Sequence, residues 1–133
     1  MSVRFSKYTH CAGYPSCGQI IITYLFPSGK QWSNHPIPGK YYKGITRVAY
    51  LPDNKEGQII LEMLKVAFER KLVFTIGSSR TTGEEGVITW TDIHHKTDNR
   101  PHTQFGYPDP SYLSRVKDEL AAKGVTEDDI PKP

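Results

Sequence analysis

The longest apolar run of the chain predicts its main strand, over Gly18–Phe26. The residues from Ile20 to Phe26 are mostly β-branched or aromatic and show no clear polar alternation. Such a run is typical of a strand that is buried on both faces. We therefore expect this strand to be central in its sheet, closed by the turn residues Pro27–Lys30.

A helical repeat follows further along the chain. Apolar residues recur at spacings of three and four across Glu56–Lys71, which indicates an amphipathic helix that Asp53 or Asn54 can cap. A second helix is predicted with Asp109 as its cap, Pro110 in its first turn and Gly124 at its end. Its apolar face carries Leu113, Val116 and Leu120.

Shorter strands are predicted around the first helix, at Ile45–Leu51, Leu72–Ile76 and Val87–Ile93. We expect an irregular lead-in over residues 1–17, loops over residues 31–44, 77–86 and 98–106, and a final turn at residues 126–129. These elements predict an α+β fold: a single compact domain with a mixed, mostly antiparallel sheet, two main helices and long loops. The expected boundaries are a lead-in at 1–12, the domain at 13–130 and a tail at 131–133.

Composition narrows the class of protein. The 133 residues have a net charge of +3, and the basic residues are scattered, so no nucleic-acid-binding tail is indicated. No apolar run approaches the ~20 residues of a membrane span, and no signal-peptide core follows Met1, so we expect a cytoplasmic or nuclear protein and no membrane partner. Cys11 and Cys17, the only cysteines, lack the spacing of a zinc site, and we expect no metal.

Chemistry-bearing residues gather between Gly77 and Pro110. The string Gly77–Glu84 holds two glycines, four hydroxyls and Arg80, but five residues separate the glycines, so it is not a Walker A loop. Backbone amides freed by the glycines can still cradle a diphosphate. The alternative is a solvated hairpin tip.

Two further strings add candidate side chains. His94 and His95 are adjacent at a predicted strand end, so only one of them is expected to face a given pocket, either in a hydrogen-bonding or acid/base role or as a structural histidine. Phe105 and Tyr107 flank a glycine before the last helix, where aromatic rings can stack on a planar ligand and the helix start attracts anions.

Eight strings in order resemble the C-terminal domain of the deltex family of RING-type E3 ubiquitin ligases. They are Gly13-Tyr14-Pro15, His35-Pro36-Ile37-Pro38-Gly39-Lys40, Tyr50-Leu51-Pro52-Asp53-Asn54, Leu64-Lys65-Val66-Ala67, Phe74-Thr75-Ile76-Gly77, Thr81-Thr82-Gly83, Ile93-His94-His95-Lys96-Thr97 and Gly106-Tyr107-Pro108-Asp109-Pro110. The resemblance implies a domain that binds ADP-ribose or NAD as a ligand, with no required cofactor. It further implies a RING domain, an E2 and ubiquitin as partners, and ADP-ribosylated proteins or nucleic acids as targets.

The resemblance also implies a pocket, with Glu119 and His94 as candidate catalytic groups. The candidate ligand-binding residues are Gly77, Ser78, Ser79, Arg80, Thr81, Thr82, Gly83, Trp90, His94, His95, Lys96, Thr97, Phe105, Gly106 and Tyr107. Phe105 stands where some family members carry a histidine implicated in chemistry on ADP-ribose, and Arg80 stands where some carry a serine.

Three functions stay open at this point. The first is an ADP-ribose or NAD binding module that serves ubiquitin transfer with a RING domain. This chain does not supply the RING domain itself, because two cysteines cannot provide its zinc ligands. The second is an enzyme acting on a ribose hydroxyl through Glu119 with His94 or His102. The third is a single-stranded nucleic-acid binder that uses aromatic rings and cations.

Overall fold

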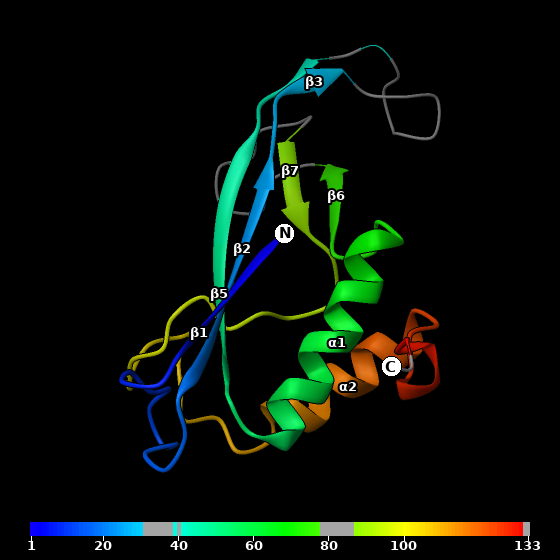
Figure 1. Cartoon of the computed structure of the whole chain (residues 1–133). Helices are drawn as coiled ribbons and strands as arrows, with labels where there is room; N and C mark the ends of the chain where they lie inside the picture. The colour runs from blue at the N-terminus through cyan, green and yellow to red at the C-terminus, as the bar shows by residue number, and fades with distance from the viewer. Residues whose placement is uncertain (31–38, 40, 78–86, 132–133) are drawn as a thin grey trace.

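A three-stranded antiparallel sheet and two helices make up most of the fold (Figure 1). The computed structural model describes residues 1–30, 39, 41–77 and 87–131. The sheet holds β1 (Ser2–Ser6), β2 (Gln19–Phe26) and β5 (Ile45–Pro52) in the order β1-β2-β5. The α+β class is confirmed, and so is the central place of the first predicted strand.

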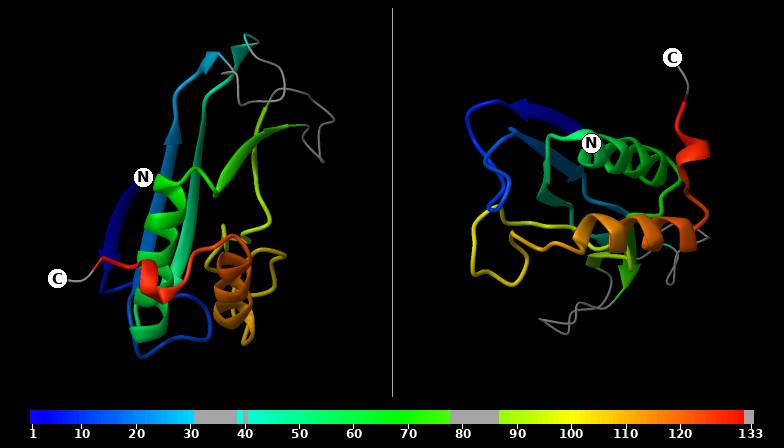
Figure 2. Two further views of the ribbon diagram at one scale, coloured as in Figure 1. Left: turned by 90° about the vertical axis from the view of Figure 1, so that its right-hand side faces the viewer. Right: turned by 90° about the horizontal axis from the view of Figure 1, so that it is seen from below.

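One prediction about β2 is wrong, because only one of its faces is buried. Ile20, Ile22 and Tyr24 are fully buried, whereas Leu25 on the other face is 65% exposed. The reason is that the helices cover a single side of the sheet (Figure 2). The aliphatic run therefore leaves apolar atoms on an uncovered outer face.

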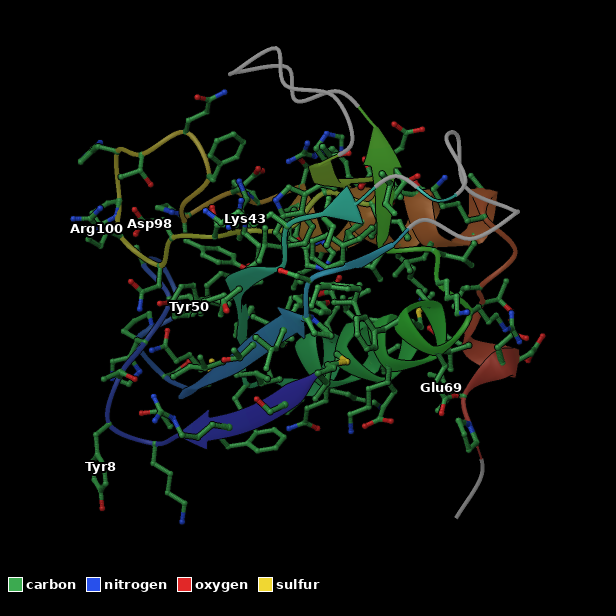
Figure 3. The ribbon with its side chains drawn as sticks, turned by 90° about the horizontal axis from the view of Figure 1, so that it is seen from above. Tyr8, Lys43, Tyr50, Glu69, Asp98 and Arg100 are labelled. Atoms are coloured by element: carbon green, nitrogen blue, oxygen red, sulfur yellow. The ribbon has the colours of Figure 1, made fainter. Side chains whose placement is uncertain are left out.

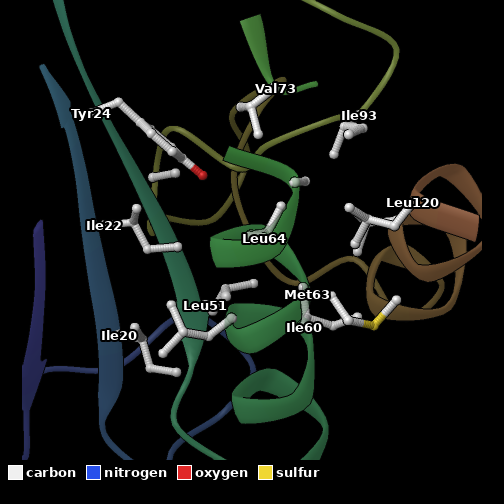
Figure 4. Close-up of a cluster of buried hydrophobic side chains, with 14 of the residues drawn as sticks. Ile20, Ile22, Tyr24, Leu51, Ile60, Met63, Leu64, Val73, Ile93 and Leu120 are labelled. Carbon is white, nitrogen blue, oxygen red and sulfur yellow. The ribbon is translucent and has the colours of Figure 1, made fainter. Parts of the chain in front are cut away.

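The helix α1 (Lys55–Glu69) lies between the sheet and the second helix, and the core forms on both of its sides (Figure 4). Asn54 is its cap: the Asn54 side-chain oxygen accepts the Gly57 N–H at 2.7 Å. Ile60 and Leu64 are buried with the strand residues, and Met63 lies toward α2. The helix ends two residues before the predicted Lys71, which takes a φ of 62°.

The helix α2 (Tyr112–Ala122) begins later than predicted, with Ser111 rather than Asp109 at its N-cap. The Asp109 carboxylate instead pairs with Lys96 and Arg115, and so it is not available to the helix amides. Gly124 follows the helix with a φ of 83°, which confirms it as the terminator. A final 3-10 turn, η1 (Glu127–Asp129), is present where a turn was expected.

The remaining strands form two small antiparallel sheets, and several loop and strand predictions are corrected. β3 (Gly29–Lys30) pairs with β4 (Tyr41–Tyr42) inside a predicted turn and loop, and β1 lies in the predicted irregular lead-in. β6 (Phe74–Gly77), near the strand predicted at Leu72–Ile76, pairs with β7 (Val87–Trp90) as a hairpin. β7 ends before the predicted Ile93.

Thr91, directly after β7, still binds the residues that precede β6. Its hydroxyl donates to the Leu72 carbonyl oxygen at 2.7 Å and its N–H to the Val73 carbonyl oxygen at 3.0 Å, and the chain then turns away toward α2. Residues 91–97 thus run as an irregular segment between the hairpin and the helices. Within the described ranges, no helix has the length and apolar character needed to cross a membrane.

Candidate functional site

His94 and Glu119 form the clearest polar contact among the predicted site residues. The Glu119 carboxylate accepts the His94 backbone N–H at 3.0 Å and contacts the His94 Nδ1 at 2.5 Å. The Tyr112 hydroxyl donates to the His94 carbonyl oxygen at 2.7 Å. Because Tyr112 and Glu119 are seven residues apart on one helix, they share a face of α2 and fix both backbone polar groups of His94.

This contact determines how the His94 ring is presented. A carboxylate only accepts hydrogen bonds, so His94 Nδ1 must carry the proton and, in the neutral ring, Nε2 is left with a lone pair. The His94 side chain is 67% exposed and that of Glu119 is 25% exposed. In its neutral form His94 therefore offers an oriented acceptor nitrogen at the surface, beside a partly buried carboxylate.

His95 has the opposite environment, as the alternation of the chain predicts. It is buried, its Nδ1 donates to the Ile93 carbonyl oxygen at 3.0 Å, and its Nε2 accepts from the Tyr24 hydroxyl at 2.8 Å. Its ring stacks on Trp90 with centroids 4.4 Å apart. Burial lowers the pKa of His95 to about 4, so the ring is neutral at pH 7.

Trp90 and Phe74 extend this stack into the hairpin. Their ring centroids are 4.4 Å apart, and the two residues are direct partners in the pairing of β6 with β7. Tyr24 contacts both rings from β2, at 5.2 Å and 5.9 Å between centroids. The hairpin, the sheet and the segment that carries His94 are thereby packed into one aromatic cluster.

Lys96 links the irregular segment to the start of α2. Its Nζ lies 2.9 Å from Asp109 Oδ2 and over the ring of Tyr112 at 5.3 Å, and its side chain is only 11% exposed. The hydrogen bond from Lys96 holds the pKa of the Asp109 carboxyl below its usual range. The Lys96 carbonyl oxygen accepts the Tyr50 N–H at 2.8 Å, which ties the segment to β5.

The string before α2 divides into buried and exposed aromatic residues. Tyr107 is buried, and its hydroxyl donates to the Tyr50 carbonyl oxygen at 2.7 Å. Gly106 is required by close packing, because a Cβ there would lie 2.3 Å from the Arg100 carbonyl oxygen. Phe105 is 50% exposed, so it is the aromatic ring of this string that solvent can reach.

The predicted glycine loop lies mostly outside the described residues. Gly77 is the last residue of β6 and pairs with Val87. Ser78, Ser79, Arg80, Thr81, Thr82 and Gly83 belong to the part that the structure does not describe. The described candidates therefore separate into two exposed side chains, His94 and Phe105, and a supporting set that is buried or half-buried: Trp90, His95, Lys96, Thr97, Gly106 and Tyr107.

Two functional contributions were missed from the sequence. The apolar spacing of α2 gave no reason to expect that the Tyr112 hydroxyl holds His94, and Asp109 was interpreted as a cap rather than as the partner of Lys96. The i, i+7 spacing of Tyr112 and Glu119 is the signal that was available for the first. Over the described ranges, no cluster of three or more His, Cys, Asp or Glu side chains is arranged to hold a metal ion.

Comparison with known proteins places the sequence of this chain in a family. The sequence matches the family described as the Deltex C-terminal domain over residues 1–125. It is 56% identical over 116 residues to a "Probable E3 ubiquitin-protein ligase DTX3" of Homo sapiens, covering 86% of this chain and 33% of that protein. It is 48% identical over 118 residues to "E3 ubiquitin-protein ligase DTX1" of Homo sapiens, covering 86% and 19%.

A third relative gives the same result. "E3 ubiquitin-protein ligase DTX4" of Mus musculus is 46% identical over 119 residues, covering 87% of this chain and 19% of that protein. The chain thus spans a third or less of the curated relatives it matches. The match over residues 1–125 and these identities show that the chain belongs to the deltex C-terminal domain family.

Proposed function

We propose that this chain is an ADP-ribose or NAD binding module of a deltex-type E3 ubiquitin ligase, which recruits ADP-ribosylated molecules for ubiquitin transfer by a RING domain and its E2. The family membership supports the setting, because the relatives are named E3 ubiquitin-protein ligases. The observation that carries the binding role is the orientation of the exposed His94 ring by Glu119.

The arrangement suits a ligand with ribose hydroxyls. The neutral His94 ring has its Nε2 lone pair directed away from Glu119, and such a nitrogen accepts a hydrogen bond from an O–H group. Its backbone is fixed by Glu119 and Tyr112, so little conformational entropy is lost when a ligand binds. Phe105 adds an exposed ring on which a planar base can stack.

A second candidate function is chemistry on the bound ribose, and the same contact favours it. A carboxylate that holds an imidazole in one tautomer is the arrangement by which enzymes turn histidine into a general base. In this role His94 Nε2 takes the proton of a ribose hydroxyl, and Glu119 stabilises the imidazolium that forms. Some relatives carry a histidine at the place of Phe105. This chain does not, so His94 is the imidazole that remains for this role.

Isothermal titration calorimetry tests the binding role, with ADP-ribose, NAD and a short single-stranded oligonucleotide at two salt concentrations. We expect saturable binding of ADP-ribose or NAD, weakened about 5-fold to 100-fold in His94→Ala, since a lost hydrogen bond to a ligand costs roughly 1 to 3 kcal/mol. The control is His10→Ala, an exposed histidine in the segment before β2 whose ring contacts the Cys17 carbonyl oxygen.

Two outcomes would contradict the proposal. Equal losses in His94→Ala and His10→Ala would remove His94 from the site. Binding of the oligonucleotide alone, with a steep dependence on salt, would favour the single-stranded nucleic-acid binder instead.

A further inference from the structure

A groove on the outer face of the sheet lies apart from His94 and Glu119. It has a volume of about 560 Å³, and its lining includes Arg4, Lys7, Gln19, Ile21 and Tyr50. The six consecutive residues 4–9, which are the second half of β1 and the turn after it, form one wall. Tyr50 lies near the loop that carries Asp98 and Arg100, while Tyr8 projects from the turn (Figure 3).

The strand register shows how this groove is built. Arg4 pairs with Ile21 and Ile21 with Tyr50, so the three side chains form a row across β1, β2 and β5. They lie on the opposite face from Ile20 and Ile22, which face α1 and the core. The groove therefore occupies the face that neither helix covers.

Its floor is held in place by a chain of hydrogen-bonded polar groups that runs from the buried Gln19 to the exposed Thr9. Gln19 is 3% exposed, and its side-chain oxygen accepts from Asn99 Nδ2 at 2.9 Å. Gln19 Nε2 donates to the Thr9 hydroxyl at 2.7 Å, and that hydroxyl donates to the Ser6 hydroxyl at 2.7 Å. These bonds join the turn after β1 to β2 and to the loop after β7, so the groove is formed before any ligand arrives.

The charge of the groove selects its ligand. Arg4 and Lys7 are exposed, and within the described part of the chain neither makes an ion pair with a carboxylate. No aspartate or glutamate is among the lining residues. Two cations beside Ile21 and the rings of Tyr8 and Tyr50 complement a ligand that carries carboxylates and apolar groups together.

We propose that this groove docks an acidic, partly apolar peptide segment in an extended conformation. Carboxylates of such a segment reach Arg4 and Lys7, and its apolar side chains contact Ile21 and Tyr50, because all four residues line the same groove.

A peptide fits this groove better than a nucleic acid does. Tight binding of a nucleic acid rests on many phosphate contacts along a basic track, whereas the groove offers two cations. A short peptide needs only a few charges, and the apolar row supplies the rest of the contact area.

Fluorescence anisotropy tests the proposal with a labelled peptide of alternating Glu and Leu, against a peptide of alternating Lys and Leu. We expect saturable binding of the acidic peptide, at least tenfold weaker in the double variant Arg4→Glu, Lys7→Glu, with unchanged affinity for ADP-ribose. Arg47→Glu is the matched control, because Arg47 is an exposed cation of β5 in register with Tyr24 and so on the other face. If the double variant does not fold, Lys7→Glu alone, in the turn, replaces it with an expected loss of threefold or more.

The proposal is overturned by any of three results. The first is no binding of the acidic peptide, and the second is an equal loss of affinity in Arg47→Glu. The third is tighter binding of a single-stranded oligonucleotide that the Arg4 and Lys7 substitutions also weaken. Because the ADP-ribose titration is run on the same samples, failure of this groove and failure of the ADP-ribose site are distinguished.

Discussion

The Tyr24 hydroxyl donates to Nε2 of His95 across 71 positions of sequence, at 2.8 Å in the buried centre of the molecule. The bond requires an unprotonated Nε2, and the Ile93 carbonyl oxygen requires a proton on Nδ1. Both nitrogens of His95 are thus satisfied only in one neutral tautomer. This bond joins the sheet to the segment that carries His94, so the charge state of His95 affects the site next to it.

The pH dependence of stability should report His95. Burial lowers its pKa to about 4, against about 6.5 in the unfolded chain, so the unfolded state binds one more proton between these values. The free energy of unfolding should therefore fall as the pH drops from about 6.5 to about 4, by about 3 kcal/mol from this group. Urea unfolding of the native chain and of His95→Gln, across pH 4 to 7, measures the difference. A slope as steep in His95→Gln as in the native chain would contradict this assignment.

The Lys96–Asp109 pair should contribute more to the free energy of unfolding than an exposed ion pair does. Its side chains are 11% and 24% exposed, and loss of Lys96 leaves the half-buried Asp109 with Arg115 and the Ser111 hydroxyl as partners. Lys96→Met should therefore lower the free energy of unfolding by about 1 to 3 kcal/mol. Lys117→Met removes the exposed pair with Glu127 and should change the free energy of unfolding much less. Equal effects in urea unfolding would show that Lys96 is no more than a surface cation.

Some of the fold was predictable because local patterns decided it. The spacing of Ile60, Leu64 and Phe68 defined α1, and Gly124 ended α2 through its positive φ. β1 was missed because an edge strand with mostly exposed side chains lacks an apolar pattern. The error over β2 has a tertiary cause, since nothing in an aliphatic run tells how many of its faces the helices cover.

The candidate site was predictable in part for a similar reason. Adjacent residues of an extended chain face opposite ways, so the separation of His94 from His95 followed from sequence. The role of Tyr112 did not, because its bond to the His94 carbonyl oxygen depends on how α2 docks. The choice between Asp109 as a cap and as the partner of Lys96 was likewise settled by packing between distant segments.

Glu119→Gln should change which His94 nitrogen carries the proton. The carboxylate accepts from both the backbone N–H and Nδ1, whereas a glutamine amide has one oxygen and a donor NH₂ group. If its oxygen keeps the backbone bond, the NH₂ group favours an unprotonated Nδ1, and the proton moves to Nε2. Nitrogen-15 NMR of the imidazole should show Nε2 without a proton in the native chain and with one in Glu119→Gln. Asp118→Asn, an exposed neighbour on α2, is the control and should match the native spectrum.

Phe105→His should separate binding from chemistry at the candidate site. Phe105 has no proton to exchange, but its half-exposed ring can stack on a ligand, and its carbonyl oxygen accepts the Asp98 N–H at 3.2 Å, so its backbone is fixed independently of the side chain. The substitution should therefore alter the affinity for ADP-ribose less than about threefold. With a RING domain, an E2 and ubiquitin supplied, the native chain should conjugate ubiquitin to ADP-ribose slowly, and a second imidazole should raise that rate roughly tenfold to a hundredfold, near the lower end of what a positioned acid or base contributes. Phe105→Gln, polar but without a titratable proton, should leave the rate low. Rapid conjugation by the native chain that survives both Phe105→Ala and Glu119→Ala would show that the groups responsible lie outside this site.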